Sequence, residues 1–259
     1  MHAINMVGRY LKLAYVILLM LLLFLGFKNS SGVVFGNQDV DATTSRMRAI
    51  ERERQALLAF KQGVMVDSKK EVLTSWGSAT EAQTQDCCRG VYCDNQTGHV
   101  IRLHLHYKFL RGTISPKLIE LQHLEYLDLS LNYFNGSQIT EVLGSLTNLR
   151  YLDLSWAGFG SQIPYQLGTL LNCNIWTSNM IFFVRIYTLS WLTPLSSMNH
   201  LDLSFANLSK VFDWLETVNK LPNLRNLTLS SCSLPPPMSS ILSFINASKS
   251  LARILATMV

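Results

Sequence analysis

The sequence lacks the short motifs by which many catalytic sites are recognised. It has no P-loop, no HExxH zinc motif, no GxSxG nucleophile elbow and no dinucleotide-binding fingerprint. It also lacks a clustered basic patch, since residues 1–120 hold 15 Lys and Arg against 10 Asp and Glu, and residues 121–259 hold 7 against 7. Nucleic-acid binding needs basic residues gathered on the folded domain, so we expect no nucleic-acid partner. We predict a protein that is not an enzyme and holds no cofactor and no metal.

Long apolar runs are also scarce, and the one run that could enter a membrane lies near the N-terminus. Arg9 and Lys12 precede fourteen uncharged residues, 14–27, and small residues follow as far as Gly36. Fourteen residues are short for a membrane-spanning helix, which needs about twenty, and are typical of a signal-peptide core. We therefore predict a signal peptide over residues 1–36, with an uncleaved signal anchor as the alternative. Either version sends the chain through the secretory pathway to the extracellular space or the plasma-membrane surface.

Five N-glycosylation acceptor sequences agree with that destination. Such sequons mark surface segments of secreted proteins. The acceptors are Asn95, Asn135, Asn207, Asn226 and Asn246. We expect at least some of them to carry a glycan in a chain that enters the secretory pathway.

Leucine is abundant, at 43 of 259 residues, and it recurs at a fixed spacing. Two leucines separated by one residue return at intervals of 24, 25, 49 and 26 residues, where 49 covers two periods. The pairs begin at Leu103, Leu127, Leu152, Leu201 and Leu227. This period is typical of leucine-rich repeats, in which both leucines point into the interior because strand side chains alternate between faces. We predict an α/β fold, a right-handed leucine-rich-repeat solenoid over residues 100–259 with about six units.

Two of these units depart from the pattern. Two other residues are expected to have a role in the interior. The fourth unit places Asn174 where a core leucine belongs, so we expect it to be degenerate, and the last unit stops at Val259, so we expect it to be truncated. Asn132 lies at an inward turn position, where its amide can satisfy backbone groups of neighbouring coils. Cys232 occupies the same position and can act there as a weak thiol donor.

The residues between and after the paired leucines are expected to line the concave face of the solenoid. Aromatic side chains on a rigid curved sheet form a good contact surface for a protein or peptide. The candidate ligand-binding residues are His104, Tyr107, Asp128, Leu131, Asp153, Trp156, Asp202 and Phe205. In the alternative, a glycan or the irregular segment around residues 180–193 covers Trp156 and Phe205. His104 and His106 face the same way, but without a third ligand nearby we expect a solvated pair.

Residues 46–99 precede the repeats and are expected to form a cap, because the end of a solenoid otherwise exposes its hydrophobic interior. Within it, residues 50–61 carry apolar side chains at 50, 57, 58 and 60 with charged residues between them, a pattern that predicts an amphipathic helix. Five cysteines in an exported chain leave at least one thiol outside any disulfide.

The cap and the repeats resemble the extracellular part of plant leucine-rich-repeat receptor-like proteins and receptor kinases. The likeness rests on ERERQALLAFK, LTSW, the CC–GVYCDNQTGHVIRL join and the IP-containing repeats. The segment LSKVFDWLETVNKLPNL resembles the branch that contains fungal-elicitor receptors. The resemblance implies a recognition protein of plant defence or development that binds a protein, peptide or microbial elicitor and signals with a co-receptor kinase. It implies membrane attachment only through an uncleaved signal anchor or a missing C-terminal span.

The cysteines of the cap depart from this family. The resemblance implies a cysteine just before the ERERQALL helix that pairs with the first of the CC doublet, whereas this chain has Ala49 there. Cys88 and Cys93 can still close a small loop, so a disulfide between them is expected. This assignment leaves Cys87, Cys173 and Cys232 without predicted partners.

Two other functions fit the same sequence. A secreted inhibitor similar to the polygalacturonase-inhibiting proteins would share the cap and the repeats and would block a cell-wall hydrolase. A truncated product that does not fold would have no function. The recognition module remains our first expectation, and the inhibitor and the non-functional product are its alternatives.

Overall fold

The computed structural model describes residues 37–65, 73–76, 88–160, 162–178, 186–235 and 253–255. The predicted signal peptide, residues 1–36, and the glycan acceptor Asn246 lie outside these ranges. Within them, no helix combines the length and the apolar character needed to cross a membrane. The chain divides into two compact units, Met1–Arg48 and Ala49–Val259. Helix α2, Asn37–Gly63, begins in the first unit and ends in the second.

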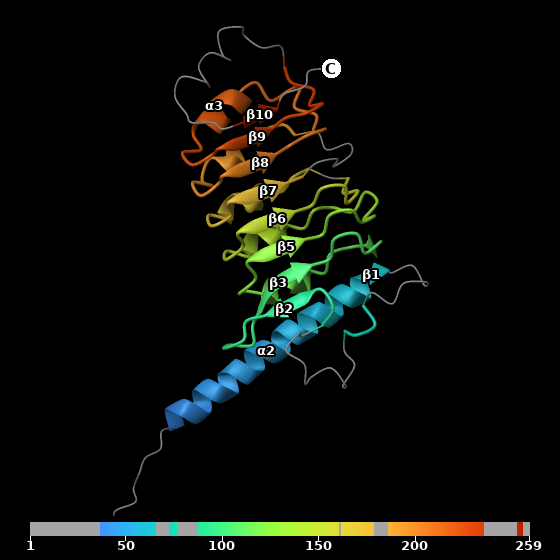
Figure 1. The fold of residues 1–259 in the computed structure, drawn as a ribbon, viewed down its shortest axis with the longest axis vertical. Coiled ribbons are helices and arrows are strands. Elements are labelled where there is room, and N and C mark those ends of the chain that lie inside the picture. Colours follow the sequence, from blue (N-terminus) through green and yellow to red (C-terminus); the bar gives the residue numbers. More distant parts are fainter. Residues whose placement is uncertain are drawn as a thin grey trace, which may run out of the picture. The chain divides into compact units, whose positions relative to one another are not determined.

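Most of the second unit is a stack of coils, each of which contributes one short strand to a common sheet (Figure 1). The sheet has eight strands in the order β10-β9-β8-β7-β6-β5-β3-β2, and every described neighbouring pair is parallel except β2 with β3. The strands are β2 (Val91–Cys93), β3 (Val100–His104), β5 (Tyr126–Asp128), β6 (Tyr151–Asp153), β7 (Ile175–Thr177), β8 (His200–Asp202), β9 (Asn226–Thr228) and β10 (Arg253–Leu255). A separate antiparallel pair joins β1 (Val64–Met65) to β4 (Arg111–Gly112).

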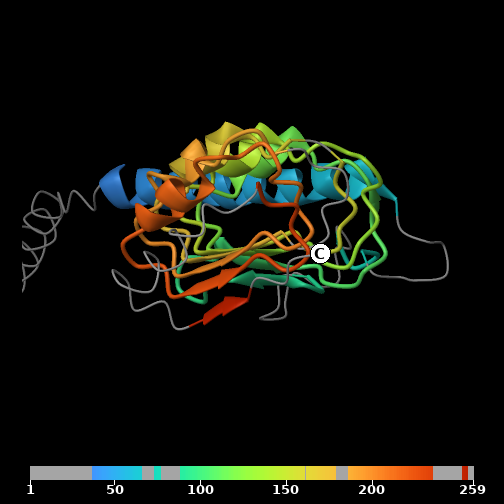
Figure 2. The same cartoon turned by 90° about the horizontal axis from the view of Figure 1, so that it is seen from above.

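Short helices cover the side of the coils opposite the sheet, as the view along the stack shows (Figure 2). Four are 3₁₀ helices and one is a short α-helix. They are η1 (Pro116–Glu120), η2 (Glu141–Ser145), η3 (Tyr165–Thr169), η4 (Ser190–Leu192) and α3 (Trp214–Asn219). Ser115 and Thr140 are the N-cap residues that directly precede η1 and η2, and each side chain accepts a hydrogen bond from a backbone N–H in the first turn.

The paired leucines fill the space between the sheet and the helices. All ten leucines of the five recognised pairs are at most 2% exposed. Parallel pairing holds them in register, so that Leu127 lies between Leu103 and Leu152. Each coil therefore buries its apolar face against its neighbours, which confirms the predicted α/β leucine-rich-repeat fold.

The fourth coil keeps the repeat register, contrary to the interpretation of its sequence. Trp176 pairs with Leu152 on one side and Leu201 on the other and is 2% exposed, so it occupies the position of the first leucine. Ser178, which is 3% exposed, replaces the second leucine. Asn174 is exposed, and its assignment to the core was wrong. The pattern was missed because an indole and a hydroxymethyl group stand where leucine is expected.

The cap covers the first coil with the second half of α2 and a buried tryptophan. The helix buries Leu57 and Phe60, as the amphipathic pattern predicted, and also Ala56. Ile50 and Leu58, which belong to the same pattern, are half-buried. Trp76 is 2% exposed, lies 6.1 Å from the Phe60 ring between centroids, and donates from its indole to the Arg89 carbonyl at 3.1 Å. Its indole N–H is thereby satisfied in an otherwise apolar setting.

The predicted disulfide between Cys88 and Cys93 is wrong. Cys93 is disulfide-bonded, but its partner is not Cys88. The backbone of Cys88 pairs with Val91 across a tight turn, in which the Val91 N–H donates to the Cys88 carbonyl at 2.8 Å. Cys88 lies opposite Val91, and at the usual strand rise Cys93 lies about 7 Å beyond Val91. The Cα atoms of Cys88 and Cys93 are therefore farther apart than the about 4.4–6.8 Å that separates bridged cysteines. The turn thus favours a different partner.

Two other thiols are buried in the coils. The Cys173 thiol donates to the Ile175 carbonyl at 3.4 Å, and the Cys232 thiol donates to the Leu203 carbonyl at 2.9 Å. The second contact confirms the predicted donor role of Cys232. Burial raises the pKa of Cys173 to about 12 and that of Cys232 to about 11.

Both thiols are therefore expected to resist alkylation in the folded protein. The thiolate is the reactive species, and at pH 8 both groups stay protonated because their pKa values lie above their ordinary value. Iodoacetamide at pH 8 should label Cys173 and Cys232 in urea and leave them unlabelled without it, as read by peptide mass spectrometry. Equal labelling rates with and without urea would contradict the buried placement.

Candidate recognition surface

The outward-facing side chains of the sheet form columns, because parallel strands that pair in register align equivalent residues. One column consists of the residues before each leucine pair. These are Arg102, Tyr126, Tyr151, Ile175, His200 and Asn226. The next column consists of the residues between the leucines. These are His104, Asp128, Asp153, Thr177, Asp202 and Thr228. We call this surface the outer face of the sheet, and it is the face that the sequence predicted to be concave.

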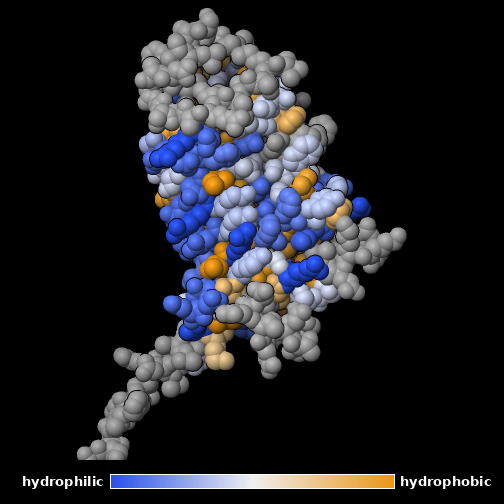
Figure 3. Space-filling view, viewed as in Figure 1, coloured by the Kyte–Doolittle hydropathy of each residue, from blue (hydrophilic) through white to orange (hydrophobic). Residues whose placement is uncertain are grey.

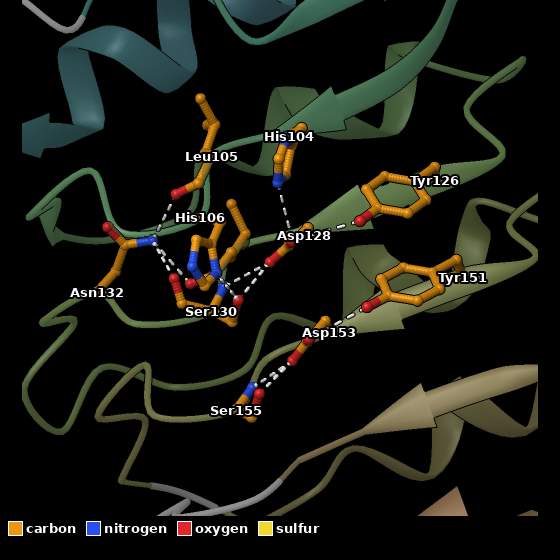
Figure 4. A network of polar contacts seen from close by, with 11 residues as sticks. His104, Leu105, His106, Tyr126, Asp128, Ser130, Asn132, Tyr151, Asp153 and Ser155 are labelled. Carbon is orange, nitrogen blue, oxygen red and sulfur yellow. Dashed lines mark hydrogen bonds and ion pairs between the residues drawn. The ribbon is translucent and has the colours of Figure 1, made fainter. Parts of the chain in front are cut away.

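The three predicted aspartates of this face are engaged with the serine two residues further along the chain, as Figure 4 shows for Asp128 and Asp153. The Oδ1 atoms of Asp128, Asp153 and Asp202 accept the backbone N–H of that serine at 3.0, 2.9 and 2.8 Å, respectively. The same oxygens accept the serine hydroxyl. Asp128 is 5% exposed, so little of its carboxylate is open to a ligand. The carboxylates thus shape the turn that follows each strand.

His104 and His106 lie beside this network, and each contacts a different member of it. His104 Nε2 is 3.3 Å from Asp128 Oδ2, and His106 Nδ1 is 2.8 Å from the hydroxyl oxygen of Ser130. Their ring centroids are 6.1 Å apart. Burial lowers the pKa of His104, although the Asp128 carboxylate opposes that shift. His104 therefore offers a neutral imidazole at the surface at neutral pH.

Two tyrosines and an arginine form a stack that the sequence pattern did not predict. The Tyr126 and Tyr151 rings lie 4.2 Å apart between centroids and are nearly parallel, at 8°. The Arg102 guanidinium lies 4.1 Å from the Tyr126 centroid and 5.3 Å from that of Tyr92, within cation–π range. Burial raises the pKa of Tyr126, with Asp128 adding to the shift. The repeated YLDLS sequence was the signal that could have revealed the stack.

Four of the predicted residues form a column at the turn after the strands, which we call the turn column. They are Tyr107, Leu131, Trp156 and Phe205, and they are 54, 37, 47 and 44% exposed. All four have positive φ, between 53° and 63°, a conformation that is rare for bulky side chains.

Hydrogen bonds between coils hold this conformation in place. The N–H groups of Tyr107, Leu131 and Phe205 donate to serine carbonyls of the next coil, at 3.0, 2.9 and 2.9 Å. Aromatic neighbours extend the column at its first coil, because the Phe109 ring lies 4.5 Å from Tyr107 and 6.0 Å from Tyr133. The structure thus places large side chains at fixed positions on a rigid backbone.

The outer face offers separate hydrophobic side chains in a polar setting. Figure 3 shows this side of the molecule as mostly hydrophilic, with isolated hydrophobic residues. Such a mixture of aromatic and polar groups is typical of interfaces formed by soluble proteins. The outer face combines the turn column with the tyrosine stack. The predicted aspartates fix the backbone of the turns that follow the strands.

The described glycan acceptors differ in exposure. Asn95, Asn135 and Asn207 are exposed, whereas Asn226 is half-buried on β9. Glycosylation at all four, and at Asn246, stays a prediction from the sequons.

Comparison with known proteins identifies the cap and the relatives of the repeats. Residues 50–94 match the leucine rich repeat N-terminal domain family. The chain is similar to "Receptor-like protein EIX1" of Solanum lycopersicum, with 36% identity over 258 residues, which is 93% of this chain and 23% of that protein. It is also similar to "Receptor-like protein EIX2" of the same plant, with 43% identity over 130 residues, 45% of this chain and 12% of that protein.

Solved structures agree on the fold. The ectodomain of the Arabidopsis thaliana receptor kinase GASSHO1/SCHENGEN3, in complex with CASPARIAN STRIP INTEGRITY FACTOR 2, superposes with a TM-score of 0.60 and 26% identity over 78% of this chain and 23% of that one. PEPR1–AtPEP1 superposes with a TM-score of 0.59 and 23% identity, over 80% and 27% of the two chains. The chain spans about a quarter of the length of EIX1. It is thus a leucine-rich-repeat protein with the N-terminal cap domain, related in sequence to the plant leucine-rich-repeat receptor-like proteins.

Proposed function

We propose that this chain is an extracellular recognition module that binds a protein or peptide on the outer face of its sheet. The observation that carries the proposal is the turn column, because its four large side chains are 37–54% exposed. Aromatic side chains supply much contact area at low entropic cost. The GASSHO1/SCHENGEN3 ectodomain, which shares the fold, is complexed with CASPARIAN STRIP INTEGRITY FACTOR 2, and this supports a peptide or protein ligand.

The relatives support a proposal for the wider role. Similarity to receptor-like proteins supports a place outside the cell, in defence or development signalling, without catalysis by this part of the chain. A co-receptor kinase would then carry the signal inward. The predicted signal peptide, residues 1–36, and the cap and repeat boundaries, 46–99 and 100–259, belong to the same proposal.

Substitution of Phe205 by alanine tests the surface, with Phe212→Ala as its matched control. Phe205 belongs to the turn column, whereas Phe212, which is 79% exposed, lies just before α3 and outside the column. Peptides would be selected from a phage-displayed random library on the immobilised secreted chain, and their affinities measured by surface plasmon resonance. We expect Phe205→Ala to weaken binding at least tenfold, since buried aromatic anchors dominate interface energy, and Phe212→Ala to leave it unchanged.

Peptides that bind both variants as they bind the parent chain would place the site elsewhere. Retention of the chain on immobilised fungal polygalacturonase would favour the alternative function, a secreted inhibitor of a cell-wall hydrolase. A cooperative thermal melt of the secreted chain would refute the alternative of a product that does not fold.

A further inference from the structure

A buried carboxylate and two histidines meet where the cap joins the first coil. Glu53 lies on α2 and is 3% exposed. His99 directly precedes β3, and His123 lies in the turn between η1 and β5. One ligand atom from each residue lies within 4.8 Å of the others. Three segments of the chain thus present metal-binding side chains to one point.

The contacts show how closely these groups approach one another. Glu53 Oε1 is 2.8 Å from His99 Nδ1 and 3.4 Å from His123 Nδ1. The two imidazole rings stack with centroids 3.8 Å apart at 16°. The second oxygen, Oε2, accepts the Val100 N–H at 2.8 Å, which fixes the carboxylate.

The backbone around the two histidines is equally fixed. The His99 carbonyl accepts the Asp94 N–H at 2.8 Å. His123 lies between Leu121 and Leu124, both fully buried. The His123 side chain is itself 52% exposed, so it can adjust and a ligand can reach it.

We propose that Glu53, His99 and His123 form a binding site for a zinc ion. Two neutral imidazoles and one carboxylate are a common three-ligand set for Zn²⁺, with a fourth, open position for water. Atoms bound to one tetrahedral zinc at about 2.0–2.1 Å lie roughly 3.3 Å apart. The Glu53–His123 pair already has this separation, and the Glu53–His99 pair needs to widen by about half an ångström. A zinc ion lies close to the plane of each imidazole that binds it, so the exposed His123 ring would also have to turn out of its stack with His99.

Zinc at this point would connect the cap helix to the first and second coils. Glu53 comes from α2, His99 from the start of the sheet, and His123 from the turn that leads to β5. A ligand at free concentration c that binds only the folded state stabilises it by RT ln(1 + c/Kd), so the melting temperature should rise with the zinc concentration. The inference is independent of the proposed recognition function, because none of the three residues lies in the turn column.

Zinc titration of the full chain tests the site. The chain would be secreted and purified without a polyhistidine tag, stripped with a chelator, and titrated with ZnCl₂ at pH 7 by calorimetry. We expect one ion per chain, a higher melting temperature with zinc, and an affinity at least tenfold weaker in His123→Ala. His106→Ala is the matched control, because His106 is also near the surface but contacts Ser130, and its affinity should equal that of the parent chain.

A residue-resolved readout covers the case in which a variant fails to fold. Diethylpyrocarbonate modification of the parent chain, followed by peptide mass spectrometry, should show that zinc protects His99 and His123 and leaves His106 reactive. Absence of saturable binding below 1 mM zinc would overturn the proposal. So would equal zinc affinity in His123→Ala and the parent chain, or protection of His106 in place of the other two.

Discussion

Replacing Asn132 by alanine is expected to lower the free energy of unfolding by about 3 kcal/mol or more, since each buried backbone group left without its partner costs about 1–3 kcal/mol. Asn132 is 1% exposed. Its Oδ1 accepts the N–H groups of Lys108 and Leu110 at 3.2 and 2.9 Å. Its Nδ2 donates to the carbonyls of Leu105 and Leu129 at 2.8 and 2.7 Å, and also to that of Ser130. One amide thus satisfies the turns of two neighbouring coils (Figure 4).

Urea unfolding followed by circular dichroism measures this loss, and Asn148→Ala supplies the comparison. Asn148 also donates to a backbone carbonyl of the preceding coil, that of Gln122 at 2.8 Å, but it is exposed. Water can replace that hydrogen bond, so we expect a loss below about 1 kcal/mol. Equal losses in the two variants would show that burial of the Asn132 network contributes nothing to stability.

Replacing Gly144 by alanine should destabilise the stack by a comparable amount. A Cβ atom at Gly144 would lie 2.2 Å from the Gln166 carbonyl oxygen and 2.6 Å from its carbon. Both atoms belong to the backbone of the next coil, in η3, and cannot turn away as a side chain could. Overpacking of a filled interior usually costs about 1–3 kcal/mol, and a clash with backbone belongs at the upper end. We expect a loss of about 3 kcal/mol.

Ser145→Ala is the control for this substitution, because Ser145 is the next residue of η2 and is exposed. It changes the same 3₁₀ helix without adding an atom between coils, and its effect should stay within about 0.5 kcal/mol. Thermal unfolding of both variants under the same conditions measures the difference. A Gly144→Ala variant as stable as Ser145→Ala would mean that the coils can separate locally at no cost.

The repeat positions were predictable because each one serves the same purpose in every coil. A leucine at one end of a short strand and another two residues later both face inward, so their spacing shows in the sequence. Asn132 and Cys232 were identified on the same grounds, and both make the predicted contacts with backbone carbonyls. The turn column also followed from position alone, because Trp156 and Phe205 occupy equivalent places in their coils. Its role in binding stays a proposal.

The failures of prediction concern residues whose position depends on a particular neighbour. Trp176 fills a leucine position and meets the Trp191 ring at 4.3 Å between centroids, a contact that a leucine pattern does not contain. The Cys88–Cys93 disulfide was expected from the short sequence separation. The turn that pairs Cys88 with Val91 decides otherwise. Local spacing alone does not determine which atoms face one another.

The amino-acid sequence by itself determined the period of the coils, the inward direction of the leucines and the kinship with receptor-like proteins, because each depends on a pattern repeated along the chain. Only the tertiary structure decided that Glu53, a charged residue on the cap helix, is buried against His99, His123 and the Val100 N–H. It also decided the stacking of Tyr126 on Tyr151. These contacts join different coils and the cap, so they follow from the register in which the coils stack.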